Sequence, residues 1–138
     1  MMDGPGVFGK PGCFESYAAA SALPALARRR QASFHAADGA DVAQRAAAGD
    51  TVARAALEEN AAAVGSACAL LADLLVLDVI VLGSLATYLG DAWIERVHTT
   101  FEREALPRHA AACTLRAPSL PTIQDLSGLA AALYGNRP

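Results

Sequence analysis

The side chains that could carry out acid–base chemistry or bind a metal are scattered through the chain. Zinc takes about four ligands in tetrahedral geometry, and the three cysteines and three histidines of this 138-residue sequence have no ligand-like spacing. Four of the acidic residues, Asp50, Glu58, Glu59 and Asp73, fall at predicted helix starts or on solvent-facing helical positions. None forms an acid–base pair, so we predict neither a metal site nor a catalytic residue.

The distribution of charge argues against two classes of partner. The net charge is −3, and Arg28–Arg30 is the one concentrated run of basic residues, a run suited to the C-terminal end of a helix. We therefore expect no binding to nucleic acid. The most apolar stretch, residues 61–86, is interrupted by Asp73 and Asp78, so we expect no membrane span either.

The cysteines indicate the compartment. Cys68 and Cys113 lie in apolar surroundings, as small core residues do. An odd number of cysteines without a pairing pattern argues against a disulfide scaffold and for the reducing cytoplasm.

Glycines, prolines and capping residues predict where the first helices lie. Residues 1–12 are rich in glycine and proline and predict turns and loop. A helix is expected from residue 14 or 15 to about residue 30, with Pro24 restarting it behind an N-cap at Ser21. Asp41 is expected to cap a short helix over residues 42–48.

A long helix should follow, capped by Asp50 and ending near residue 75. Its apolar residues recur at helical spacing and predict its buried face. They are Ala53, Leu57, Val64, Cys68, Leu71 and Leu75.

The rest of the chain alternates short strands and helices. Residues 79–82 are a continuous β-branched run, typical of a parallel strand covered on both faces. A loop over 83–90 should lead to a helix that Asp91 caps and Pro107 ends, and residues 113–116 predict a second strand. A last helix is expected over residues 125–134. Two strands are too few for a stable sheet, so part of the fold is expected to lie outside this chain.

The segment from residue 9 to residue 17 resembles a family signature. It resembles the motif CxCGxxGCxE of the ROK family (repressor, open reading frame, kinase), followed by a tyrosine at the start of a helix. The matching residues are Gly9, Gly12, Cys13 and Glu15.

In that family the cysteines of the motif and an upstream histidine hold a structural zinc. Here Gly6 and Phe8 stand at the positions of the first two cysteines, so that only Cys13 remains. One thiol cannot supply a tetrahedral ligand set, and we expect no zinc in this protein.

Further segments resemble the family in the same order along nearly the whole chain. The resemblance implies the C-terminal half of a ROK sugar kinase, a helix-rich α/β lobe of the actin-like ATPase (ribonuclease H-like) fold with a short, mostly parallel sheet. Residues 1–12 would be a loop, residues 13–138 the lobe, and the N-terminal lobe would be absent. The matching segments are 41–43, 46–50, 79–83, 91–93 and 126–132.

The resemblance also implies two ligand contacts. In ROK sugar kinases the glutamate that ends the motif contacts hydroxyls of the hexose, a task suited to a carboxylate because it accepts two directed hydrogen bonds, so Glu15 is the expected sugar ligand. Alternatively, Glu15 only places negative charge in the first turn of a helix. The strand–glycine turn of the family passes close to the nucleotide, which makes Gly83, Ser84 and Leu85 the expected nucleotide contacts. Ser84 replaces the second glycine of the family, and a plain strand-to-helix turn is the alternative.

Phosphoryl transfer needs a phosphate loop, magnesium ligands and a base. In ROK kinases the phosphate loop and an aspartate base lie upstream of the cysteine motif. The complete protein would use ATP and Mg²⁺, whereas the isolated chain is expected to give no turnover and no calorimetrically measurable binding of ATP or glucose.

Three functions remain open. The first is a lobe of an ATP-dependent kinase acting on glucose or an N-acylhexosamine. The second is the sugar-sensing effector lobe of a ROK transcriptional repressor, in which a helix-turn-helix domain precedes the same fold. The third is a non-catalytic oligomerisation module, in which the alanine-rich helix of residues 50–75 packs against a copy of itself to give a homodimer.

Overall fold

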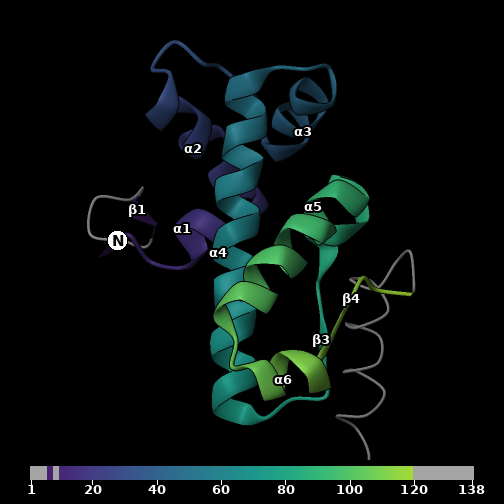
Figure 1. Ribbon diagram of the computed structural model, residues 1–138. Helices are drawn as coiled ribbons and strands as arrows, with labels where there is room; N and C mark the ends of the chain where they lie inside the picture. Colours follow the sequence, from purple (N-terminus) through teal and green to yellow (C-terminus); the bar gives the residue numbers. More distant parts are fainter. Residues whose placement is uncertain (1–5, 8–9, 120–138) are drawn as a thin grey trace, which may run out of the picture.

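The structure is a computed structural model that describes residues 6–7 and 10–119, and one long helix, α4, organises them. The elements α1, α2 and α3 pack around its N-terminal half, while α5, α6 and a two-stranded sheet lie along its C-terminal half (Figure 1). The elements in order are β1 (Gly6–Val7), β2 (Lys10–Pro11), α1 (Glu15–Ala18), the 3₁₀ turn η1 (Ala20–Ala22), α2 (Leu23–Arg30), α3 (Gly39–Ala47), α4 (Thr51–Leu75), β3 (Val79–Val81), α5 (Ser84–Glu104), α6 (Pro107–Ala112) and β4 (Thr114–Arg116).

The start of α4 is as predicted, but its buried face is different. The Asp50 carboxylate accepts hydrogen bonds from the backbone N–H groups of residues 52 and 53, at 2.8 and 3.0 Å, and so caps the helix. Leu71 and Leu75, expected to be buried, are 42% and 60% exposed. The helix instead buries small residues, because α5 approaches so closely at Gly65 that a Cβ there would lie 2.6 Å from the carbonyl oxygen of Val97.

The segments before α4 depart from the prediction in three places. Residues 6–7 and 10–11 pair as antiparallel strands where only loop was expected. Pro24 does restart a helix, α2, but Ala22 is its N-cap residue and Ser21 lies exposed in η1. The side chain of Asp38 caps α3 by accepting from the N–H of Asp41 at 2.9 Å. Asp41 therefore lies in the first turn of α3, and the prediction that it is the cap is wrong.

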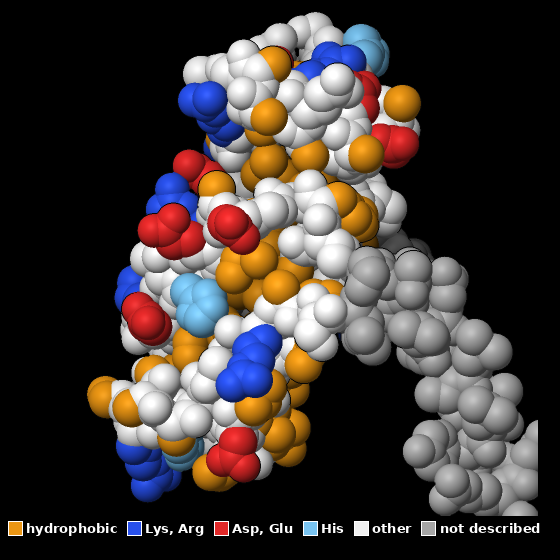
Figure 2. Space-filling view, turned by 90° about the vertical axis from the view of Figure 1, so that its right-hand side faces the viewer, with side chains coloured by type: hydrophobic (Ala, Val, Ile, Leu, Met, Phe, Trp, Pro, Cys, Tyr) orange, Lys and Arg blue, Asp and Glu red, His pale blue; other side chains and the backbone are white. Residues whose placement is uncertain are grey.

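The strands β3 and β4 pair in parallel, as predicted, with Ile80 beside Leu115 in the register. The expectation that the first strand is covered on both faces is wrong for the described residues. Val79 and Val81 are 45% and 55% exposed, whereas Leu115 is buried on the other face of the sheet. Figure 2 views the molecule from the right-hand side of Figure 1 and shows hydrophobic side chains at its surface.

The connection after β3 is helical where a loop was predicted. Gly83 is the N-cap residue of α5, which begins at once. Gly90, with φ of 75° and ψ of −176°, is not helical, so α5 consists of two helical segments joined by a kink, and Asp91 stands at the start of the second segment, where a helix was predicted to begin. Pro107 begins the further short helix α6, while α5 already ends at residue 104. The helix predicted over residues 125–134 lies outside the described residues.

Two hydrophobic clusters lie along α4. The upper cluster, beside the N-terminal half of α4, includes Leu23, Leu26 and Val42. The lower cluster, beside its C-terminal half, includes Val97 and Phe101. The side chain of Leu89 packs against both. Cys68 and Cys113 are buried in the lower cluster as free thiols, which confirms their prediction as core residues. Burial raises the pKa of Cys68 to about 11 and that of Cys113 in the same direction, so neither thiol is poised to react.

Candidate functional site

A groove of about 740 Å³ lies between α3, α4 and α5. Alanines of α3, together with Leu57 and Ala61 of α4 and Leu89 and Ala92 of α5, give it an apolar lining. Its three walls come from three helices that follow one another along the chain. The small alanine side chains leave room between the helices, so the groove is open where larger residues would fill it.

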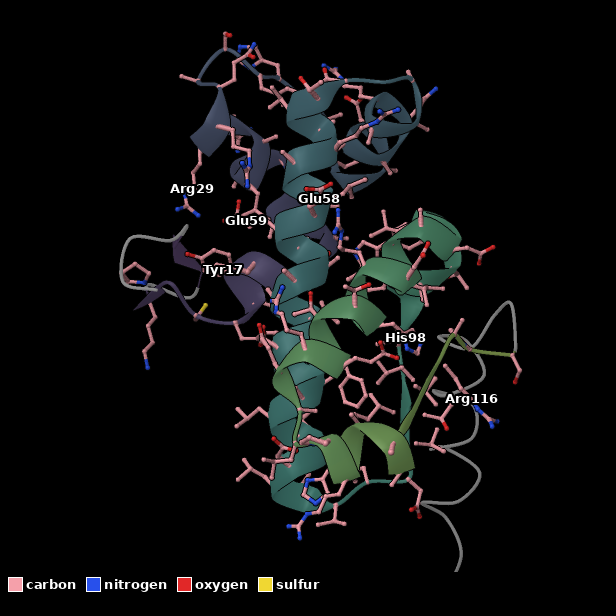
Figure 3. The ribbon with its side chains drawn as sticks, viewed as in Figure 1. Tyr17, Arg29, Glu58, Glu59, His98 and Arg116 are labelled. Atoms are coloured by element: carbon pink, nitrogen blue, oxygen red, sulfur yellow. The ribbon has the colours of Figure 1, made fainter. Side chains whose placement is uncertain are left out.

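Charged and aromatic side chains stand at the edge of this groove. Arg54 donates from Nε to the carbonyl oxygen of Ala46 at 2.9 Å and so ties the end of α3 to the start of α4. Arg96 of α5 pairs with Glu58 of α4 at 2.9 Å. In Figure 3, Glu58 and its neighbour Glu59 lie on different flanks of α4, with Glu59 near Arg29. An apolar lining beside two guanidinium groups suits a flat apolar ring that carries an anionic group.

A buried amide supports the back of the groove. Trp93, which lines the groove, donates from its indole nitrogen to the side-chain oxygen of Asn60 at 2.9 Å. The Asn60 nitrogen donates in turn to the carbonyl oxygen of Tyr17 at 2.6 Å and to that of Ala19 at 3.4 Å. Asn60 is fully buried, and these contacts satisfy it completely. Through it, the end of α1 is connected to the wall of the groove.

The predicted nucleotide turn precedes the part of α5 that lines the groove. Gly83 has a φ of −64°, and a Cβ added to it would meet no atom of the described residues, apart from its chain neighbours, within 4 Å. Ser84 begins α5, and Leu85 is partly buried against the lower cluster. The next turn of the same helix carries Tyr88 and Leu89 into the groove lining. The three predicted contact residues do not themselves line the groove.

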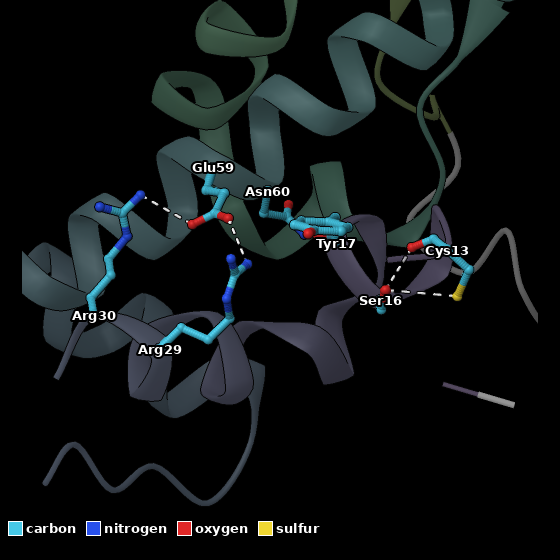
Figure 4. A network of polar contacts seen from close by, with 7 residues as sticks. All are labelled: Cys13, Ser16, Tyr17, Arg29, Arg30, Glu59 and Asn60. Carbon is cyan, nitrogen blue, oxygen red and sulfur yellow. Dashed lines mark hydrogen bonds and ion pairs between the residues drawn. The ribbon is translucent and has the colours of Figure 1, made fainter. Parts of the chain in front are cut away.

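The predicted sugar contact, Glu15, is exposed at the first position of α1. The start of α1 is held by the buried hydroxyl of Ser16, which donates to the carbonyl oxygen of Cys13 at 2.6 Å (Figure 4). The Cys13 thiol lies 3.7 Å from the same hydroxyl, a local packing arrangement. In Figure 1, α1 lies to the left of α4 and α5 to its right, so the described residues do not bring Glu15 and the Gly83 turn together. Both ligand roles stay predictions.

One of the three histidines, His109, is buried. His109 of α6 forms a 2.8 Å hydrogen bond from Nδ1 to the carboxylate of Asp73, and Arg108 donates to its Nε2. Asp73 also accepts from the N–H of Leu106 at 3.1 Å and thereby joins α4 to the start of α6. This cluster has a structural role. Within residues 10–119, no three His, Cys, Asp or Glu side chains are grouped as metal ligands, and none of the described helices is long and apolar enough to cross a membrane.

Sequence reasoning missed the groove and the buried amide. One signal for the amide was present, because Asn60 stands at helical spacing between Leu57 and Val64, within the stripe predicted to be buried. A polar side chain in such a stripe must find buried partners. The groove had no comparable signal, since it depends on how α3 and α5 are placed on α4.

Comparison with known proteins supports the fold. A solved structure described as a ROK family transcriptional regulator, a homologue of the E. coli MLC protein, superposes with a TM-score of 0.68 at 20% identity. The match covers 83% of this chain and 31% of that one, so the chain spans about a third of the length of that regulator. No curated protein sequence gives a match. The family model of the ROK family matches residues 2–134, and the chain therefore belongs to the ROK family.

Proposed function

We propose that this chain is the lobe of an ATP-dependent hexose kinase that contacts the nucleotide along the α3–α4–α5 groove and the sugar through Glu15. Its substrate would be glucose or an N-acylhexosamine, with ATP and Mg²⁺ acting in the complete protein. Phosphoryl transfer needs a phosphate loop and a base, which in ROK kinases lie upstream of the cysteine motif. The chain on its own would therefore transfer no phosphate.

The open turn at Gly83 is the observation that carries the nucleotide part of this proposal. The absence of any described atom within 4 Å of a Cβ at this position leaves space for a ligand against the backbone. The backbone N–H groups at the start of α5 favour anions such as phosphates. From there the groove, with Arg54 and Arg96 at its edge, would receive the remainder of the nucleotide.

The sugar part depends on Glu15. Its carboxylate is exposed at the start of a helix that the Asn60 amide fixes to the rest of the fold. An exposed carboxylate on a fixed backbone can accept hydrogen bonds from two adjacent sugar hydroxyls. The other wall of a sugar site would come from a part of the kinase fold that this chain does not span.

Two measurements test the proposal together. The pure chain, incubated with ATP, Mg²⁺ and a panel of hexoses, should release no sugar phosphate. Because Trp93 is the single tryptophan and lines the groove, its fluorescence should respond to millimolar Mg·ATP, weakly, since one wall of the site is missing. The response should be lost in Gly83→Ala and kept in Glu102→Ala, a change at an exposed position on α5.

Phosphate transfer at rates typical of complete kinases would overturn the proposal, as would a fluorescence response that Gly83→Ala leaves intact. A response to sugar with none to nucleotide would instead favour the effector lobe of a repressor. The DNA upstream of the reading frame offers an independent check. An in-frame DxGGT-type segment with an ExGH motif would indicate a kinase, and a helix-turn-helix pattern a repressor.

A further inference from the structure

Three of the described residues that line the groove are charged, and they lie together at its edge. Glu58 follows Arg54 by one turn of α4, so the two side chains lie on the same face of that helix. From α5, Arg96 donates from Nη2 to the carboxylate of Glu58 at 2.9 Å. The carboxylate of Glu58 is therefore held beside one guanidinium group and one helical turn away from a second.

The contact between Arg96 and Glu58 is easily opened. Their side chains are 50% and 60% exposed, and exposed ion pairs contribute little to stability, because water screens the charges and two long side chains lose freedom. Arg54 donates from Nε to the carbonyl oxygen of Ala46 at 2.9 Å, and among the residues that the structure describes it forms no ion pair with a carboxylate. The groove edge therefore offers two guanidinium groups to an anion.

We propose that the groove binds an organic phosphate with a flat apolar ring, that its phosphate group binds to Arg54 and Arg96, and that Glu58 competes with this group for Arg96. A phosphate monoester carries about two negative charges at neutral pH and matches two guanidinium groups, which donate parallel hydrogen bonds to its oxygens. Glu58 carries a single negative charge and is the weaker partner. In the structure its carboxylate contacts Arg96 in the place that the phosphate would take.

The ring would lie against the apolar part of the lining. Ala92 precedes Arg96 by one turn of α5, so both lie on one face of this helix, and Leu57 lines the groove from α4. The groove volume of about 740 Å³ is within the roughly 300–1,000 Å³ of small-molecule sites. Because the apolar wall and the guanidinium group are one turn apart, the ligand needs its phosphate close to its ring.

This inference rests on the groove of the proposed function and adds a contact that regulates it. It requires neither the Gly83 turn nor phosphoryl transfer. Because the competing anion belongs to the chain itself, removing the charge of Glu58 should raise the affinity for the ligand. A residue that only supports the shape of the groove would lower the affinity when it is changed.

Phenyl phosphate is the simplest probe with this chemistry, and the indole N–H signal of Trp93 in NMR spectra reports its binding. Trp93 is the single tryptophan and lines the groove, so the signal is unambiguous. Phenyl phosphate should shift this signal and approach saturation below about 10 mM. Inorganic phosphate, which lacks the ring, and phenol, which lacks the anion, should each bind at least about tenfold more weakly.

Glu58→Gln should tighten the binding of phenyl phosphate by about two- to fivefold, the gain expected when an exposed ion pair no longer competes. Glu59→Gln removes the same charge from the other flank of α4 and should leave the affinity unchanged (Figure 3). Arg96→Ala should weaken binding at least about fivefold, whereas Arg103→Ala, on α5 outside the groove lining, should not change it. In the Arg96→Ala background the gain from Glu58→Gln should fall below about twofold.

An affinity for phenyl phosphate that Glu58→Gln lowers or leaves unchanged, in a variant whose far-UV circular dichroism matches the wild type, would overturn the proposal. So would the absence of any shift, or inorganic phosphate or phenol binding as tightly as phenyl phosphate. An equal gain with and without Arg96 would contradict competition for that residue. Gly83→Ala, which should abolish the response to Mg·ATP, should leave the binding of phenyl phosphate intact, so failure of this inference and failure of the proposed function give different results.

Discussion

Replacing Asn60 by leucine should destabilise the fold strongly, because leucine has a similar volume but no hydrogen-bonding groups. The substitution removes the acceptor of the buried Trp93 indole N–H and the donor that satisfies the carbonyl oxygen of Tyr17. Each buried polar group left without a partner costs about 1–3 kcal/mol. The expected loss is therefore about 2–5 kcal/mol, a large share of the roughly 5–15 kcal/mol of a typical domain.

Urea unfolding followed by far-UV circular dichroism measures this loss without depending on the fluorescence of Trp93. A matched control is Gln44→Leu, which removes an exposed helical amide and should change the unfolding free energy by less than about 0.5 kcal/mol. A second background, Trp93→Phe, removes the indole donor in advance. In that background Asn60→Leu should cost about 1–3 kcal/mol less, because one group fewer is left unsatisfied.

A loss for Asn60→Leu as small as that of Gln44→Leu would refute the reasoning. So would a cycle in which Asn60→Leu costs the same with and without the indole, since the two side chains would then not act as a bonded pair. Either outcome would mean that the amide does not connect the end of α1 to the groove wall.

Three further substitutions and one pH series give the remaining predictions. Gly65→Ala should cost about 1–3 kcal/mol in urea unfolding, because its Cβ would meet the backbone of α5 at 2.6 Å. Gly83→Ala should change stability by less than about 0.5 kcal/mol in the same assay, since its Cβ has open space, and equal losses at both glycines would contradict the packing described. Asp73→Ala should cost about 1–3 kcal/mol by leaving the buried His109 and the N–H group of Leu106, just before α6, without their acceptor, and its helicity and urea midpoint report this. A hydrogen bond from an arginine one turn later, with one from a backbone N–H, holds the pKa of Asp41 below its ordinary value of 3.8. A lowered folded-state pKa gives stability that is present above the ordinary value and lost as pH falls through the folded one. Below about pH 4 the urea midpoint should therefore fall less steeply in Asp41→Asn than in the wild type, and identical slopes would count against the ion pair.

Local signals predicted those parts of the fold that depend on a few adjacent residues. The Asp50 cap needs only a carboxylate and the next three residues, and the structure has it where the sequence indicates. The parallel pairing of β3 and β4 also follows from a β-branched run and a helical crossover. Asp41 shows the limit of such signals, because Asp38 three residues earlier is an equally good cap. Neighbouring acidic residues compete, and only the path of the chain decides between them.

Features that depend on packing were outside the reach of local patterns. Leu71 and Leu75 fit the helical spacing of a core face, yet they are exposed because Gly65 lets α5 approach the opposite side of the helix. The helical start of α5 was missed since its glycine and polar residues are typical of loops. At the candidate site, the Gly83 turn was expected from the family resemblance, while the groove exists only where α3 and α5 meet α4.

The central claim is that nucleotide lies against the Gly83 turn and the adjoining groove, and amide chemical-shift mapping of the isotope-labelled chain with Mg·ATP tests it most directly. We expect the shifts to be concentrated at residues 83–89 and along the groove edge at Arg54 and Arg96, and to disappear in Gly83→Ala. Shifts confined to the arginines at the end of α2, or no shifts at millimolar nucleotide, would contradict the claim.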